Sequence, residues 1–186
     1  GFANYYLYDL DGKLHATLTS HDFEVGPILR IEGDTMWYLA RSGDNPYKMQ
    51  LHRVKLNGTG DKRLTDPAFN HTVNIAPGGK YFLDTYETAS IPPTTVLRDG
   101  EGKQLAVLAE SDISEFNALG LQPIEVFTFV AADGKSICYG TLEKPSNFDP
   151  GKKYPLLVSV YAGPDSGGVR EVFSAPTATT EFGFLV

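Results

Sequence analysis

One short pattern occurs three times along this chain of 186 residues, and it constrains the fold more than any other feature. Each copy begins at a leucine, passes through a turn of Asp or Asn with Gly, and closes at a second leucine; the copies are Leu7–Leu18, Leu51–Leu64 and Leu97–Leu108. The leading leucines are 44 and then 46 residues apart, and the closing leucines are 46 and then 44 apart. Asp, Asn and Gly tolerate the positive φ that tight hairpins require. The pattern therefore predicts a β-hairpin in each copy.

The segments between these copies repeat as well, at a spacing of 44 residues. Apolar positions alternate there, which is typical of strands, and no stretch of residues 1–110 keeps a helical period. The matched positions are Ile31 and Ile75, Trp37 and Tyr81, Tyr38 and Phe82, and Leu39 and Leu83.

Four strands in 40–50 residues are the signature of a β-propeller blade, whereas an ordinary antiparallel sandwich has no reason to recur at one spacing. We therefore expect a mainly β fold: residues 1–110 form a partial β-propeller, with about two four-stranded blades and the end of a third. A propeller needs at least four blades to close its ring, so we expect further blades upstream and a fragment of a larger protein.

The pattern changes after residue 110. Residues 111–121 are expected to form a linker with one helical turn, which Ser111 or Asp112 would cap. Strands are predicted at 126–130 and 136–142, around a turn at Asp133-Gly134. The apolar run 156–163 is typical of a strand buried on both faces of a sheet, and 180–186 indicates a strand cut off in mid-run. The chain thus looks truncated at both ends.

Composition excludes several classes of partner and cofactor. The net charge of -7 argues against a nucleic-acid partner, because phosphate binding needs a clustered basic surface. No apolar run is long enough to span a membrane. Cys138 is the single cysteine, and no two histidines have a ligand spacing such as i, i+4, so neither a metal site nor a cofactor is expected.

Asp165-Ser166-Gly167-Gly168 looks like the nucleophile loop of a trypsin-type protease. Such a serine would need a histidine and an aspartate from a double β-barrel, and the repeat leaves no place for that barrel. We therefore interpret Ser166 as a loop residue.

The segment "KKYPLLVSVYAGP", Lys152 to Pro164, follows the repeats and the hairpin. This combination resembles the prolyl oligopeptidase family of serine peptidases, and most closely its dipeptidyl peptidase IV branch. The resemblance implies that residues 122–186 are the N-terminal strands of an α/β-hydrolase domain. It also implies that Tyr161 donates its phenolic hydroxyl to the oxyanion hole, where one such donor accelerates acyl transfer by about 10²–10³.

The functional expectation follows from the same resemblance. The chain would be a fragment of a serine-type dipeptidyl peptidase that hydrolyses bonds near the N-terminus of peptide substrates, with the propeller gating access. The family's Gly-x-Ser-x-Gly elbow is absent, so the nucleophile, acid and histidine are not in this chain, which by itself should be inactive. No Glu-Glu pair for a substrate's free amine is present either.

The resemblance further suggests a homodimeric parent in the periplasm, outside the cell or anchored to a membrane. Two alternatives stay open. One is a non-catalytic interaction protein of the same architecture, and the other is a different branch of the family, such as an acylaminoacyl peptidase or an endopeptidase.

Overall fold

The computed structural model describes residues 1–146, 148–160 and 169–174. The chain divides into two compact units. Unit 1 comprises Gly1–Tyr86 and Pro93–Glu110, and unit 2 comprises Glu87–Pro92 and Ser111–Val186.

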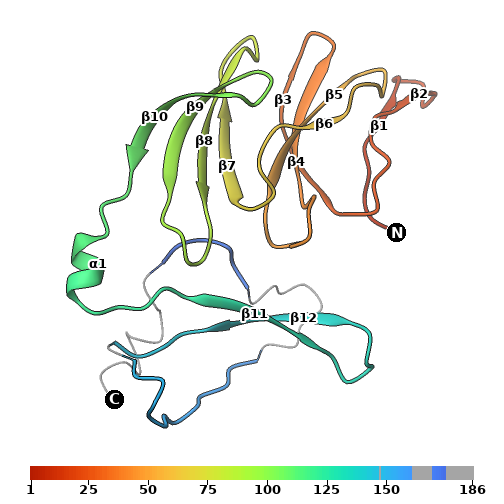
Figure 1. The fold of residues 1–186 in the computed structure, drawn as a ribbon. Coiled ribbons are helices and arrows are strands. Elements are labelled where there is room, and N and C mark those ends of the chain that lie inside the picture. Colours follow the sequence, from red (N-terminus) through yellow and green to blue (C-terminus); the bar gives the residue numbers. More distant parts are fainter. Residues whose placement is uncertain (147, 161–168, 175–186) are drawn as a thin grey trace. The chain divides into compact units, whose positions relative to one another are not determined.

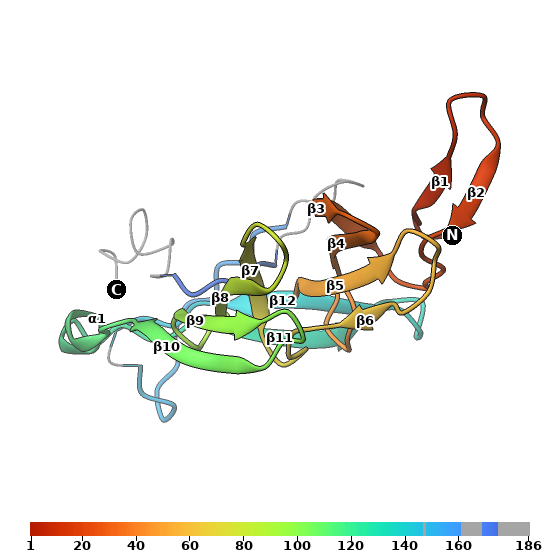
Figure 2. The ribbon, with the colours of Figure 1, turned by 90° about the horizontal axis from the view of Figure 1, so that it is seen from above.

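Unit 1 consists of antiparallel strands that pair in the order in which they follow along the chain (Figure 1). A hairpin comes first, and two four-stranded sheets follow it (Figure 2). The hairpin is β1 (Tyr6–Tyr8) and β2 (Leu14–Thr17); the first sheet is β3 (Val25–Glu32), β4 (Thr35–Ala40), β5 (Gln50–Lys55) and β6 (Lys62–Arg63); the second is β7 (Asn70–Ile75), β8 (Tyr81–Glu87), β9 (Thr94–Asp99) and β10 (Gln104–Glu110). The predicted two blades and the end of a third are thereby confirmed.

The unequal spacing of the leucines has a structural origin in the strand register. Leu39 on β4 pairs with Leu51 on β5, and Leu83 on β8 pairs with Leu97 on β9. The second sheet thus keeps the register of the first, although its β9 leucine lies 46 residues and not 44 beyond its counterpart. The two additional residues lengthen the β8–β9 hairpin, where pairing continues through Tyr86 and Thr94.

Side-chain alternation along β4 gives both faces of the first sheet an apolar partner. Met36, Tyr38 and Ala40 pack in one cluster with Leu18 and other residues of the preceding hairpin. Trp37, from the opposite face, packs in a second cluster with Leu51, Leu64, and the second sheet's Ile75 and Phe82. Sheets stacked through their faces in this way are what the blade interpretation requires.

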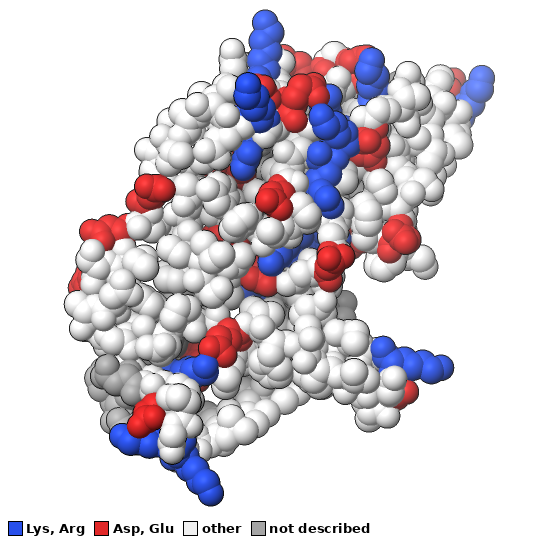
Figure 3. Space-filling model, viewed as in Figure 1, with Lys and Arg blue, Asp and Glu red and all other residues white. Residues whose placement is uncertain are grey.

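Polar contacts between the turns add to this apolar packing. Both carboxylate oxygens of Glu32 accept the N–H of Gly78 at 2.9 Å. The bond from Gly78 has the largest effect on the pKa of Glu32 and the bond from Arg30 the next largest, and both lower that pKa. Glu101 receives Arg53 at 2.7 Å and Lys62 at 3.1 Å. Figure 3 shows basic and acidic atoms side by side over these turns, so neither sign of charge dominates that part of the surface.

Unit 2 begins with one helical turn and a hairpin. Helix α1 (Ser114–Ala118) starts after Ile113, and Asp112 accepts the N–H of Ser114 at 2.8 Å. The expected helical turn is confirmed, but the predicted cap is wrong: the N-cap position is Ile113, not Ser111 or Asp112, and no side-chain capping hydrogen bond forms there. No helix within the described ranges is long and apolar enough to cross a membrane.

Strands β11 (Glu125–Val130) and β12 (Ile137–Leu142) form the hairpin of unit 2. They pair in register and start within one residue of the predicted bounds.

The predicted strand at 156–163 is wrong for its described part. Residues 156–160 adopt no strand conformation, and the side chains of Leu156 and Val160 are each 78% exposed. A strand buried on both faces needs hydrogen-bonded neighbours, and no strand within the described ranges pairs with this segment. Apolar composition alone therefore did not fix the conformation here.

Candidate functional site

Tyr161, the residue that the sequence analysis assigned to an oxyanion hole, lies outside the described residues. Ser166 and the predicted strand 180–186 also lie outside them. The polar constellations that the structure does describe are in unit 1, and neither was expected from the sequence.

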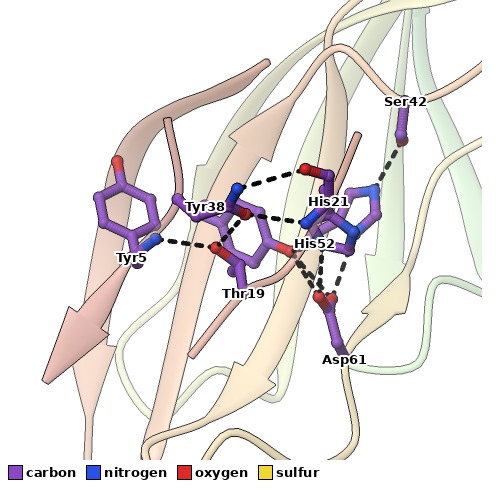
Figure 4. A network of polar contacts seen from close by, with 8 residues as sticks. Tyr5, Thr19, His21, Tyr38, Ser42, His52 and Asp61 are labelled. Atoms are coloured by element: carbon purple, nitrogen blue, oxygen red, sulfur yellow. Dashed lines mark hydrogen bonds and ion pairs between the residues drawn. The ribbon is translucent and has the colours of Figure 1, made fainter. Parts of the chain in front are cut away.

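The first constellation, the His21 cluster, comprises His21, Tyr38, His52 and Asp61 (Figure 4). Tyr38 and His52 face each other as a register pair of β4 and β5. Asp61 lies directly before β6, and His21 comes from the segment between β2 and β3. These four side chains therefore come from β4, β5, the β5–β6 connection and the β2–β3 connection.

Asp61 is the acceptor at the centre of the His21 cluster. One carboxylate oxygen lies 2.7 Å from Nε2 of His21, and the other lies 3.3 Å from Nδ1 of His52. The hydroxyl of Tyr38 donates to the same carboxylate at 2.8–2.9 Å. The nitrogen and oxygen atoms that His21, His52 and Asp61 offer to a ligand all lie within 4.8 Å of one another.

These contacts shift two acid–base equilibria in opposite directions. Burial raises the pKa of Asp61, but hydrogen bonds from His52, Tyr38 and His21 outweigh burial, so its pKa is lowered. Burial, together with the hydrogen bond to the Asp61 carboxylate, raises the pKa of Tyr38 far above its ordinary value. Asp61 is thus held as an anion beside a hydroxyl that stays protonated.

Surrounding residues fix the two histidines. Nε2 of His52 lies 2.6 Å from the hydroxyl of Ser42, and the side chain of His52 is buried. The ring of His21 stacks on Phe23, with centroids 4.2 Å apart, and its backbone N–H donates to Asn4 at 2.9 Å. Both imidazoles are therefore oriented before any ligand arrives.

The second constellation lies between β7, β8 and β9. Oδ1 of Asp84 is 2.7 Å from Nδ1 of His71, and Oδ2 is 2.7 Å from Nε of Arg98. The other ring nitrogen of His71 donates to the carbonyl of Asp66 at 2.8 Å. Because oxygen atoms of Asp84 and Asp66 occupy both ring nitrogens of His71, this arrangement resembles a structural hydrogen-bond network more than a nucleophile–base pair.

The spacing of histidines along the sequence does not reveal the His21 cluster. Ligands at i and i+4 lie within one turn of a helix, whereas His21 and His52 come from separate segments that meet only in the fold. The repeat indicated that Tyr38 and His52 lie on strands, but only the register of β4 and β5 in the structure shows that the two residues face each other.

The repeated four-stranded sheets, stacked through their faces, identify the protein as one with β-propeller blades. A family model described as "Dipeptidyl peptidase IV (DPP IV) N-terminal region" matches residues 1–93, which is half of the chain. The chain belongs to this family, and the resemblance seen in the sequence is confirmed.

Individual relatives agree with this assignment. The chain is 29% identical to the probable dipeptidyl-aminopeptidase B of Emericella nidulans, over 91% of this chain and 19% of that protein. It is 27% identical to the probable dipeptidyl peptidase 4 of Trichophyton verrucosum, over 94% of this chain and 24% of that protein. The crystal structure of Porphyromonas gingivalis dipeptidyl peptidase 4 matches 96% of this chain and 26% of its own, at 24% identity and a TM-score of 0.77. The chain thus spans about a quarter or less of these proteins.

Proposed function

We propose that this chain is part of a serine-type dipeptidyl peptidase, which hydrolyses peptide bonds near the N-terminus of peptides through an acyl-enzyme. Membership of the dipeptidyl peptidase IV family is the observation that carries the proposal. The blades of unit 1 support a propeller that restricts access to the site, and relatives that align along nine-tenths of the chain are named as peptidases of this type.

In this proposal, residues 1–110 are propeller blades, 111–121 a linker, and 122–186 the first part of the α/β-hydrolase domain. Apart from Glu87–Pro92, which group with unit 2, residues before Ser111 belong to unit 1 and those from Ser111 on to unit 2, which supports a boundary after Glu110. The motif Val160-Tyr161-Ala162-Gly163-Pro164 supports the assignment of Tyr161 as an oxyanion donor. Its hydroxyl would stabilise the negative charge that develops on the substrate's carbonyl oxygen during acyl transfer.

The nucleophile would come from elsewhere in the parent protein. This sequence has no Gly-x-Ser-x-Gly elbow, in which a serine is exposed on a sharp turn between strand and helix. Without that serine and the histidine that activates it, one oxyanion donor has no acyl-enzyme to stabilise. The 186-residue chain alone is therefore expected to be inactive.

The test compares the isolated chain with the full-length parent on two chromogenic dipeptides, one with a free α-amine and one N-acetylated. We expect the parent to cleave the free-amine substrate and to be inactivated by a serine-reactive fluorophosphonate, and the isolated chain to do neither. Preference for the acetylated substrate would instead indicate an acylaminoacyl peptidase. A parent that neither turns over substrate nor reacts with the probe would refute the peptidase assignment in favour of an interaction protein.

Ser166→Ala in the isolated chain completes this design. Activity in the isolated chain that disappears in this variant would show that Ser166 is a nucleophile after all, and it would overturn the proposal.

A further inference from the structure

We propose that His21, His52 and Asp61 bind one divalent transition-metal ion of the zinc class. Peptide hydrolysis through an acyl-enzyme makes no use of these residues, so the inference does not rest on the proposed function. It rests on three ligand atoms from separate segments that converge within 4.8 Å of one another.

The donor set suits zinc. Two imidazole nitrogens and one carboxylate oxygen are among the commonest protein ligands of Zn²⁺, and a site with three protein ligands keeps a position for water. Imidazole disfavours Mg²⁺ and Ca²⁺, which prefer oxygen ligands.

The spacing of the donor atoms is close to what a metal requires. Ligand atoms about 2.0–2.1 Å from a tetrahedral ion lie about 3.3 Å from one another. The Nδ1 of His52 is already 3.3 Å from an Asp61 oxygen, and the Nε2 of His21 is 2.7 Å from the other. Metal binding would draw the three donor atoms, which lie within 4.8 Å of one another, toward this spacing, and the side chain of His21 is part of a connecting segment and is 20% exposed.

The protons of His21 and His52 can move so that each imidazole offers a free lone pair to the metal. Without metal, the ring nitrogens of His21 and His52 that face Asp61 donate their N–H groups to its carboxylate. On metal binding the proton of His52 shifts from Nδ1 to Nε2, where the hydroxyl of Ser42, at 2.6 Å, accepts it. A hydroxyl both donates and accepts, so Ser42 satisfies His52 in either tautomer. His21 makes the same shift from Nε2 to Nδ1.

The surrounding residues resemble the outer shell of a metal site. Among the described residues, Asp61 bonds only to His21, Tyr38 and His52, so no lysine or arginine neutralises its charge. The hydroxyl of Tyr38 can remain on the carboxylate oxygen that does not bind the metal. Partners of this kind orient metal ligands, and losing one typically weakens metal affinity about 10–100-fold.

The experiment uses the 186-residue chain without a polyhistidine tag. Co²⁺ is titrated while its visible d–d absorption is followed, and Zn²⁺ is tested for displacement of that absorption and for a rise in Tm. We expect one Co²⁺ per chain, displacement by Zn²⁺, a Tm that rises with Zn²⁺, and no response to Mg²⁺.

Three variants test the assignment. His21→Gln and Asp61→Asn each remove one ligand, and we expect the affinity for Co²⁺ to fall in both by more than the roughly 10–100-fold that loss of an outer-shell partner costs. His15→Gln is the matched control, because His15 also faces a carboxylate, that of Asp9 at 3.3 Å, but lies in an exposed pair. Its affinity should equal that of the unmodified chain.

Circular dichroism without metal checks that each variant is folded. If one ligand variant fails to fold, the unmodified chain and the other ligand variant decide the question. Absence of Co²⁺ binding by the unmodified chain, unchanged affinity in a folded ligand variant, or an equal loss in His15→Gln would overturn the proposal.

Discussion

Nδ1 of His71 lies 2.7 Å from a carboxylate oxygen of Asp84, and both side chains are completely buried. Arg98 donates to the other oxygen of Asp84, so this one carboxylate accepts hydrogen bonds from two side chains. Asp84→Ala would leave those donors buried without their acceptor, which typically costs about 3–5 kcal/mol. We expect that loss in the free energy of unfolding, measured by denaturant titration.

The control for this substitution is Asp34→Ala. The Asp34 side chain is 73% exposed and lies 3.7 Å from Lys55, an arrangement that solvent screens. No measurable loss of stability is expected there. Equal losses in the two variants would show that the buried carboxylate does not hold the second sheet together.

Gly79 is fixed by the indole ring of Trp37. It has a φ of +63°, and a Cβ atom added to it would come within 2.4 Å of that ring. Gly79→Ala should therefore reduce stability by about 1–3 kcal/mol through overpacking, in addition to the backbone strain. Gly78→Ala carries similar backbone strain, at φ +81°, with nothing near the added Cβ. A difference between the two Tm values isolates the contact with Trp37, and equal Tm values would refute it.

The turn of the β11–β12 hairpin should depend on pH through Asp133. The pKa of Asp133 is lowered from 3.8 to about 2 by hydrogen bonds that its carboxylate accepts. The largest effect is from the hydroxyl of Ser136, and the N–H groups of Lys135 and Ser136 add to it. Because this folded-state pKa lies below the unfolded value, the stabilisation is complete above about pH 4 and is lost as the pH falls toward 2. NMR titration of the Asp133 carboxyl measures this directly, and a midpoint near 3.8 in the folded chain would contradict it.

Tyr161→Phe in the full-length parent tests the proposed oxyanion donor. Removing one donor of this kind should lower kcat by about 10²–10³ and change KM little, since the bond strengthens only in the transition state. Tyr154→Phe is the matched control from the same segment, because its hydroxyl instead accepts the N–H of Asp149 at 3.0 Å. If both variants retained the parent's kcat, Tyr161 would be a packing residue.

The sequence predicted the strands of unit 1 well because strand periodicity and turn chemistry are local properties. Leu39 and Leu83 were predicted to be equivalent positions 44 residues apart, and in the sheets they are equivalent, since Leu39 pairs with Leu51 and Leu83 pairs with Leu97. The Asp133-Gly134 turn was predicted equally well, because Gly134 has the positive φ that such a turn requires.

What the sequence did not predict depends on contacts between distant segments. His21, His52 and Asp61 come from the β2–β3 connection, from β5 and from the β5–β6 connection, and no spacing rule along the sequence encodes their meeting. The strand prediction for residues 156–160 was wrong for a related reason, since a buried strand depends on its neighbouring strands as much as on its own apolar residues.

The two additional residues in the β8–β9 hairpin have a consequence for how such a sheet can change length. Side chains alternate between the faces of a strand, so an even number of inserted residues leaves every core position facing inward. Phe82 and Val96 are accordingly still buried. A single inserted residue would reverse this parity on one strand and turn its apolar side chains toward water. The stacked sheets therefore tolerate insertions in this hairpin when the residues are added in pairs.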